Sequence, residues 1–242
     1  IRPSQFIYTY GPGAILDSRK GPRIILGTRR GLLHPNSSLL TKCRMPQKLM
    51  INDDRMSNIL LGGAKIFRLP THDEQNGEAY LTNPFPVWKL CVNRQMHRQT
   101  AQRYEYVLYK SANCPLNCPP VPGGSNQQAI RFVLACRNGH MDEINWGYAI
   151  HRSHNAHKPE PAHYFYDPGN GTVPSITVTC SACNAHFSMG DPRFGYYSDR
   201  IRCSARMPQS ERAGQTKPTR EYDCDEPMKM TQRRAANLRV AV

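Results

Sequence analysis

The sequence predicts an α+β fold that is β-rich, with long irregular loops and few helices, and that is stapled by cysteine sites. Three observations support this prediction. Hydrophobic residues make up 39% of the 242 residues, which is enough for a core, whereas 17 glycines and 20 prolines interrupt regular structure. The short apolar runs are rich in β-branched and aromatic residues, which favours strands. The nine cysteines include two close pairs, so the staples are expected to be zinc-knuckle or zinc-ribbon-like sites.

The chain is predicted to have two parts. Residues 1–90 are expected to form an N-terminal α/β segment, in which Gly-Pro and Gly-Gly turns separate short apolar runs such as 24–26 and 59–61. Residues 91–242 are expected to form a zinc-binding region, because every cysteine except Cys43 lies there.

Strands are predicted to outnumber helices. Four short runs, each flanked by proline, glycine or asparagine, are expected to be strands. One helix is predicted, with Asp142 as its N-cap, Trp146 as an apolar anchor and His151 near its end. Two stretches with many prolines and glycines, 115–128 and 154–174, are predicted to be loops beside the cysteine pairs. The four strand runs are residues 64–69, 104–109, 130–135 and 175–180.

The cysteines are expected to bind zinc rather than to form disulfides, because their number is odd and the chain shows no export signal. Cys180-Ser-Ala-Cys183 has the spacing that lets both sulfurs reach one tetrahedral zinc at about 2.3 Å. Cys203 and Cys224 lie in polar, charged surroundings and are expected to complete a four-cysteine site with this pair. The alternative is that these residues are buried free cysteines.

A second zinc site is expected from three more cysteines, and its fourth ligand is either His97 or Cys136. The alternative is a loop that holds no metal. Cys136 and His140 either bind metal together, or His140 orients the turn through a hydrogen bond, which is the interpretation we favour. Zinc with four protein ligands has no open position for water, so both sites are expected to be structural. The three cysteines are Cys91, Cys114 and Cys118.

The charge of the chain predicts a polyanionic partner. Lysine and arginine number 32 against 18 acidic residues, and the formal net charge is +14. Because guanidinium groups pair with phosphates and stack on bases, arginines beside aromatic residues are candidate nucleic-acid contacts. The alternatives are a solvated basic loop, and core packing for the face that carries Tyr104, Tyr106 and Leu108. The candidate contacts are Arg94, Arg98, Arg103, Arg193, Arg200, Arg202 and Arg206.

Several segments recur in the order of a known family. They are Arg2–Gln5 with Tyr10–Ile15, Ile130–Trp146, the pair Cys180 and Cys183, and Gln232–Leu238. Together they resemble the N-terminal region of DrmB, the zinc-binding, helicase-associated component of the bacterial DISARM anti-phage system. The resemblance implies a zinc-binding accessory subunit that associates with a DrmA-like helicase. It also implies that the complex engages DNA, with single-stranded overhangs as a favoured feature.

Two other functions are considered. In the first, a metal-dependent nuclease or hydrolase would use His140, Asp142 and Glu143, since imidazole and carboxylate groups can hold a divalent ion and activate water. The sequence contains no His-Glu-x-x-His helix, phosphate loop or nucleophile constellation, so we expect a non-catalytic protein. In the second, the chain is a scaffold that binds only protein.

The chain is expected to be cytoplasmic. It contains no run of about 18 apolar residues, so no membrane partner is expected. It also lacks the basic start, apolar middle and small-residue cleavage site of a secretory signal.

Overall fold

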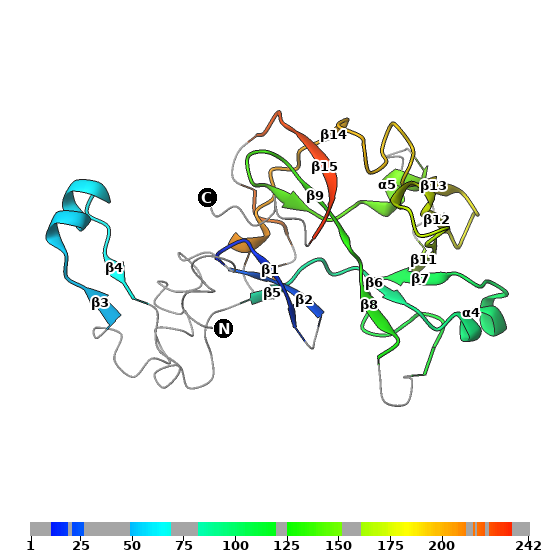
Figure 1. The fold of residues 1–242 in the computed structure, drawn as a ribbon. Helices are drawn as coiled ribbons and strands as arrows, with labels where there is room; N and C mark the ends of the chain where they lie inside the picture. Colours follow the sequence, from blue (N-terminus) through cyan, green and yellow to red (C-terminus); the bar gives the residue numbers. More distant parts are fainter. Residues whose placement is uncertain are drawn as a thin grey trace.

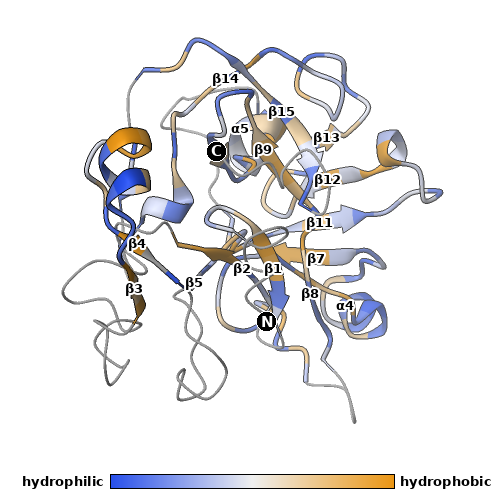
Figure 2. Ribbon diagram, turned by 60° about the vertical axis from the view of Figure 1, so that its left-hand side comes forward, coloured by the Kyte–Doolittle hydropathy of each residue, from blue (hydrophilic) through white to orange (hydrophobic). Residues whose placement is uncertain are grey.

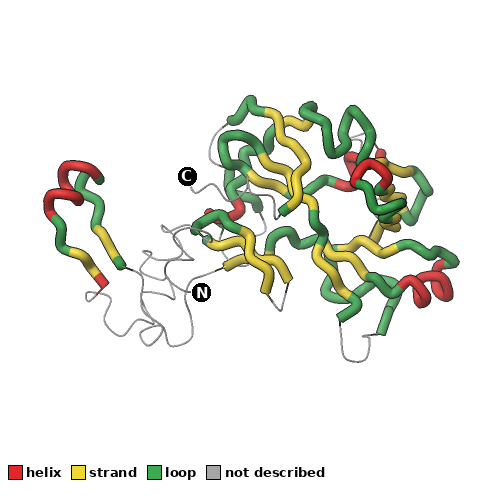
Figure 3. The backbone as a smooth tube through the Cα atoms, in the orientation of Figure 1, coloured by secondary structure: helices red, strands yellow, loops and turns green. Residues whose placement is uncertain are grey.

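The computed structural model describes residues 11–18, 21–26, 49–68, 82–119, 125–151, 161–211, 215, 217–220 and 223–233. Within these ranges the chain is β-rich and has few helices, as the sequence predicts, and its longest loops connect short strands (Figures 1 and 3). The strands form sheets of six, four, three and two strands, and every pairing is antiparallel.

The largest sheet has six strands in the order β13-β12-β11-β7-β6-β8. Successive residues of a strand point to opposite faces, so each strand contributes to two cores. Leu108 and Tyr164 are paired in register and lie in the main core, whereas Val107 and Phe165 lie in a smaller core on the other face. The strands are β6 (Lys89–Cys91), β7 (Tyr106–Tyr109), β8 (Gln127–Ala129), β11 (His163–Asp167), β12 (Thr177–Cys180) and β13 (His186–Ser188).

A four-stranded sheet, in the order β10-β9-β15-β14, completes the main core. Phe132 of this sheet and Trp146 of helix α5 (Trp146–His151) are each 1% exposed. The Trp146 ring meets the Phe187 ring of β13 edge-on, with 6.4 Å between the centroids. The two sheets and α5 therefore share one apolar interior. The strands are β9 (Phe132–Ala135), β10 (Met141–Asp142), β14 (Ile201–Arg202) and β15 (Pro227–Gln232).

The N-terminal part of the described chain contributes two small sheets. The three-stranded sheet packs Ile24 and Phe85 against Val133 and Met141 of the four-stranded sheet. The two-stranded sheet and the helical turn η2 (Met56–Leu60) stand apart from the rest in Figure 1, and Figure 2 colours part of η2 as hydrophobic. The strands are β1 (Ile15–Ser18), β2 (Gly21–Ile25) and β5 (Thr82–Pro84) in the first sheet, and β3 (Met50–Ile51) and β4 (Ile66–Phe67) in the second.

The predicted strands are present but start later than expected. The runs predicted at 104–109, 130–135 and 175–180 correspond to β7, β9 and β12, and each strand ends where the sequence predicts. The run predicted at 64–69 is reduced to the two residues of β4. Core packing of the β7 face is confirmed for Leu108, which is 0% exposed, whereas Tyr104 lies before the strand and is 54% exposed.

The predicted loops contain two strands. β8 begins inside the loop predicted at 115–128 and ends at Ala129, one residue beyond it. β11 lies entirely within the loop predicted at 154–174. Residues 120–124 and 154–160 of these predicted loops lie outside the described ranges. The boundary predicted at residue 90 falls inside β6, which pairs with β7 and β8.

The helices differ most from the prediction. The N-cap assignment of Asp142 is wrong, because Asp142 belongs to β10 and α5 begins at Trp146, where the Asn145 side chain accepts from the Tyr148 N–H at 3.0 Å. A second helix, α4 (Arg94–Ala101), is not predicted, although the Asn93 side chain caps it. Short 3₁₀ turns occur at η4 (Val173–Ser175) and η5 (Pro208–Ser210). None of the helices in the described ranges has the length and apolar character that crossing a membrane requires.

Candidate metal centres

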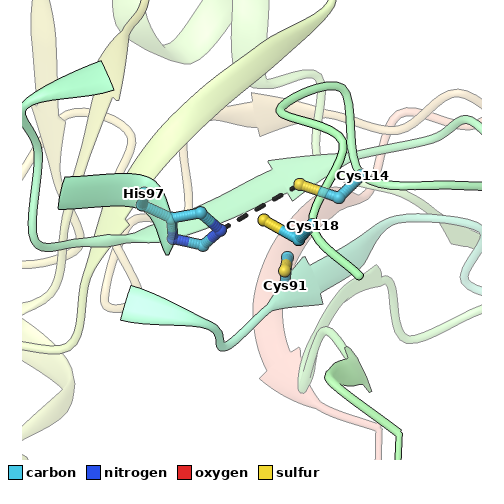
Figure 4. A group of neighbouring side chains, drawn as sticks. All are labelled: Cys91, His97, Cys114 and Cys118. Atoms are coloured by element: carbon cyan, nitrogen blue, oxygen red, sulfur yellow. Dashed lines mark hydrogen bonds between the residues drawn. The ribbon is translucent and has the colours of Figure 1, made fainter. Parts of the chain in front are cut away.

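The first candidate metal centre gathers side chains from β6, α4 and the loop after β7 (Figure 4). Its four ligand atoms, three sulfurs and one imidazole nitrogen, lie within 4.8 Å of one another. Such a set of thiolates and one imidazole is a donor set that tetrahedral zinc prefers. His97, and not Cys136, therefore joins the three cysteines of the second expected site. The members are Cys91, His97, Cys114 and Cys118.

Local structure fixes the orientation of His97. This residue lies on the inner side of α4 and is 0% exposed. Its Nδ1 donates to the carbonyl oxygen of Glu105 at 2.7 Å, so Nε2 carries the lone pair and faces the sulfur of Cys114 at 4.0 Å. A hydrogen bond from the distal ring nitrogen is the usual way in which proteins orient a metal-binding histidine.

The three thiols of this centre have different pKa values. A hydrogen bond from the Cys91 thiol lowers the pKa of Cys114 to about 4, against the opposing effect of burial, and the same bond raises the pKa of Cys91. Burial raises the pKa of Cys118 to about 11. The cluster thus stabilises one thiolate readily, and a divalent ion must displace the protons of the other two thiols.

The second candidate metal centre lies between the turn that follows β9 and the loops that flank β14 and β15. Its four ligand atoms also lie within 4.8 Å of one another. The Nδ1 atom of His140 is 3.4 Å from the sulfur of Cys136 and 3.6 Å from that of Cys203. Cys136 and His140 thus belong to one candidate ligand set. The members are Cys136, His140, Cys203 and Cys224.

The structure corrects the expected four-cysteine site, because Cys203 and Cys224 do not join Cys180 and Cys183. Strand pairing is the physical reason. β15 pairs with both β9 and β14. Cys203 directly follows β14, Cys136 directly follows β9 and Cys224 precedes β15, so these three cysteines meet at one end of the sheet. Sequence spacing alone does not reveal which strands are neighbours.

Donors around the second centre hold its sulfurs in place. The N–H of Ala205 donates to the sulfur of Cys203 at 3.3 Å, and the side-chain amide of Asn138 donates to that of Cys224 at 3.4 Å. Burial raises the pKa of Cys203 to about 12. Burial also raises the pKa of Cys224, but hydrogen bonds from the Glu226 backbone and Asn138 outweigh it, so the net shift is downward.

Cys180 and Cys183 form a third group with His151 at the end of α5. Their three ligand atoms lie within 4.8 Å of one another, and Cys183 is exposed. The sequence analysis does not join His151 to this pair, because His151 lies 29 positions before Cys180 and no motif links them. Its position at the last turn of an amphipathic helix is the only signal that the sequence offers.

The residues of the nuclease alternative do not converge on one point. His140 faces the sulfurs of the second centre, and the Asp142 carboxylate binds the Arg206 guanidinium at 2.7 Å. The Glu143 carboxylate accepts from the backbone N–H groups of Val87 and Trp88. Burial raises the pKa of Glu143 against the opposing effect of Lys110. The Arg206 guanidinium also lies 3.9 Å from the Glu143 carboxylate, so both carboxylates face this cation, whereas His140 faces the sulfurs.

The seven candidate arginines occupy different environments. Arg206 is a structural residue, since its side chain is 16% exposed and its guanidinium also binds Glu211 at 2.7 Å. We therefore withdraw Arg206 as a nucleic-acid contact. Arg94 lies over the Tyr106 ring at 4.4 Å, and Arg103 donates to the Asn184 side chain at 2.7 Å. The exposed arginines are Arg98, Arg193, Arg200 and Arg202.

The comparisons with known proteins give one family. The model of the family described as Domain of unknown function (DUF8724) matches residues 2–240, nearly the whole chain. No curated protein matches the sequence.

Proposed function

We propose that this chain, which belongs to the Domain of unknown function (DUF8724) family, is a non-catalytic, zinc-stabilised accessory subunit that helps a DrmA-like helicase to engage DNA in anti-phage defence. One observation carries the zinc-binding part of the proposal, and the helicase partner rests on the resemblance to DrmB. Two separate clusters each bring three cysteines and one histidine within 4.8 Å, which is a complete ligand set for one tetrahedral ion.

The donor chemistry favours zinc over other divalent ions. Calcium and magnesium prefer oxygen ligands, whereas each of these clusters offers three sulfurs and one nitrogen. A zinc ion bound by four such ligands has no open position for water and supports structure rather than catalysis. Both centres join segments that are far apart in the sequence, so zinc binding there would contribute directly to the free energy of folding.

The DNA-binding part of the proposal rests on charge and aromatic side chains. The chain carries a formal net charge of +14. The guanidinium carbon of Arg94 lies 5.6 Å from the centroid of the Tyr104 ring and 4.4 Å from that of Tyr106, and Tyr104 is 54% exposed. A cation beside an exposed ring can contact a phosphate while the ring stacks on a base. We therefore expect sequence-tolerant binding that prefers single-stranded overhangs.

Native mass spectrometry of the purified chain tests the zinc centres. Wild-type protein should retain at least two zinc ions. The variants Cys91→Ser and Cys136→Ser should each lose one zinc, because each removes a ligand from a different centre. His186→Ala, which removes an exposed histidine that belongs to none of these ligand groups, is the control and should retain the wild-type number of zinc ions. A folded wild-type protein that binds no zinc, or that contains disulfides among these cysteines, contradicts the proposal.

Electrophoretic mobility shifts on duplexes with and without a single-stranded overhang test DNA binding. Simultaneous Arg94→Ala, Arg98→Ala and Arg103→Ala substitutions should weaken binding to all sequences about equally. The matched control replaces Lys65, Lys217 and Lys229 by alanine, which removes the same charge from exposed positions. Wild-type affinity should fall steeply as salt rises. Equal loss in the two triple variants would assign binding to net charge alone and contradict the arginine–tyrosine site.

Copurification with a DrmA-like helicase tests the partner. The helicase should be retained by the zinc-loaded chain and lost after chelation, because the zinc centres hold the surface in shape. Retention of the helicase without any DNA binding would favour the protein-only scaffold. Release of nicked plasmid in the presence of added magnesium or manganese would instead favour the nuclease alternative.

A further inference from the structure

We propose that His151, Cys180 and Cys183 form a third zinc site that keeps one coordination position open to an exogenous, preferably anionic, donor. The proposal goes beyond the structural role assigned to the first two centres. It concerns a group to which the described residues contribute three ligands in place of four, and sites with three protein ligands bind water or a small ligand in the fourth position.

The orientation of His151 supports a ligand role. Its Nδ1 donates to the carbonyl oxygen of Gly147 at 2.9 Å, within the last turn of α5. Nε2 is thereby left with the lone pair, and it lies 3.3 Å from the sulfur of Cys183. This is the arrangement found at His97 in the first centre, where a backbone carbonyl also fixes the distal ring nitrogen.

The turn between β12 and β13 holds the two cysteines as a knuckle. The N–H of Cys180 donates to the Ala185 carbonyl at 2.8 Å, and the N–H of Asn184 donates to the Cys180 carbonyl at 3.0 Å. Asn184 has a φ of 61°, the left-handed conformation that closes this tight turn. Hydrogen bonds from the N–H groups of Ala182 and Cys183 lower the pKa of Cys180, although burial, the largest effect, raises it overall.

Packing brings the histidine to the knuckle. Helix α5 lies against β12 and β13, and Trp146 at its start contacts Phe187 of β13. Cys180 is 0% exposed and belongs to the main core, so the knuckle is anchored on one side. The rigid helix and hairpin therefore fix the histidine and both sulfurs before any metal binds.

The fourth position faces a more accessible environment than in the other two centres. Among the described residues, the group contains only three ligands, and Cys183 is exposed. The first centre, in contrast, has three buried members of four. Two thiolates and a neutral imidazole leave a bound Zn²⁺ without net charge, and Arg103 reaches the side chain of Asn184, which directly follows Cys183. This guanidinium, which also lies 3.4 Å from the Glu105 carboxylate, places a cation next to the turn and favours an anionic fourth donor.

Native mass spectrometry of zinc-loaded protein tests the number of sites. The wild type should bind three zinc ions, whereas His151→Ala and Cys183→Ser should each bind two. His186→Ala, which removes an exposed histidine of the neighbouring strand, is the matched control and should bind three. Two ions in the wild type, or three in both His151→Ala and Cys183→Ser, overturn the third site. Loss of all zinc from the wild type would instead contradict the first two centres, so the two failures are distinguishable.

Cobalt substitution tests the open position. Azide is an anionic, monodentate probe and should shift the visible d–d bands of the Co²⁺-loaded wild type. The same addition should leave the bands of Co²⁺-loaded His151→Ala unchanged, because the two remaining centres are closed. A wild-type spectrum that azide does not alter would show that a fourth protein ligand closes the site and overturn the proposal.

Discussion

At the scale of single residues, two histidines are positioned by the same local device. His97 and His151 each donate Nδ1–H to a backbone carbonyl oxygen and direct Nε2 toward a cysteine sulfur. His140 differs, because its Nδ1 faces the sulfurs. The carbonyl bond fixes the tautomer without any other side chain. His97 uses the Glu105 carbonyl between α4 and β7, and His151 uses the Gly147 carbonyl of its own helix.

Replacement of His97 by alanine should weaken zinc binding at the first centre and leave the second centre unchanged. Loss of a group that only orients a ligand costs roughly 10- to 100-fold in metal affinity, so loss of the ligand itself should cost more. Competition with a chromogenic zinc indicator measures this change. His186→Ala is the control and should behave as the wild type. Unchanged zinc affinity in His97→Ala would remove His97 from the ligand set.

Tyr166 should make the stability of the protein depend on pH in the alkaline range. Burial raises the pKa of Tyr166 to about 12, against the opposing effect of Arg131. A raised folded-state pKa means that the stabilisation is complete below the ordinary value of 10.0 and is lost as the pH rises toward about 12. Between these two pH values, the free energy of unfolding of the wild type should therefore fall by roughly 2 kcal/mol relative to that of Tyr166→Phe.

Urea unfolding near both ends of this pH range measures the difference in the free energy of unfolding. The control is Tyr197→Phe, since the Tyr197 side chain is 71% exposed. A difference in the free energy of unfolding between the wild type and Tyr166→Phe that stays constant with pH would contradict the raised pKa of Tyr166.

At the scale of elements, strand pairing and capping decide where the ligands meet. β15 lies between β9 and β14, and this order assembles the second centre. The Asn93 cap begins α4 directly after β6, which turns His97 back toward Cys91. Arg206 connects two further segments. Its guanidinium binds Asp142 of β10 and Glu211 after η5, and its carbonyl accepts from the N–H of Met141, also in β10, at 3.1 Å.

Arg206→Ala should destabilise the fold by about 3 kcal/mol, because it leaves two partly buried carboxylates without their cation. The effect appears as a lower midpoint in urea. Arg202→Ala, at an exposed position of β14, is the control and should change stability by less than about 0.5 kcal/mol. After correction for the folded fraction, DNA affinity should be unchanged in Arg206→Ala. A stable Arg206→Ala with weakened DNA binding would restore Arg206 as a nucleic-acid contact.

At the scale of the whole molecule, the candidate metal centres are part of the hydrophobic interior. The smaller core consists of Val107, Tyr109 and Phe165 together with Cys91 and Cys114 of the first centre. The main core likewise includes cysteines of the second and third groups. Several strands are only two to four residues long, so the sheets bury little surface by themselves. Zinc binding and core packing should therefore be lost together.

Chelation should unfold the region around the first centre. With a strong zinc chelator, amide hydrogen exchange should increase in β6, α4 and β7, and added zinc should restore protection. The comparison sample contains chelator already saturated with zinc. Protection that survives complete removal of zinc would show that the apolar cores suffice without metal.

The fold class follows from the sequence because short β-branched runs separated by proline and glycine are a local signal. β7, β9 and β12 end at the predicted residues for this reason. The missed helix α4 lacks that kind of signal, since its sequence is mostly polar and only His97 is buried. Asp142 is a case in which the local signal misleads. It is a good capping residue, but it lies in strand β10 and its carboxylate binds Arg206.

The sequence by itself determined that cysteines and a few histidines are the chemistry-bearing residues, because their spacing and polar surroundings are local properties. It also determined the Cys180–Cys183 knuckle, whose two sulfurs are close in any conformation of the tight turn. Only the tertiary structure decided that Cys203 and Cys224 join Cys136 and His140, and that His151 joins the knuckle. These contacts depend on which strands pair and which helix packs on them, and such long-range choices are set by the burial of the whole apolar surface rather than by any one segment.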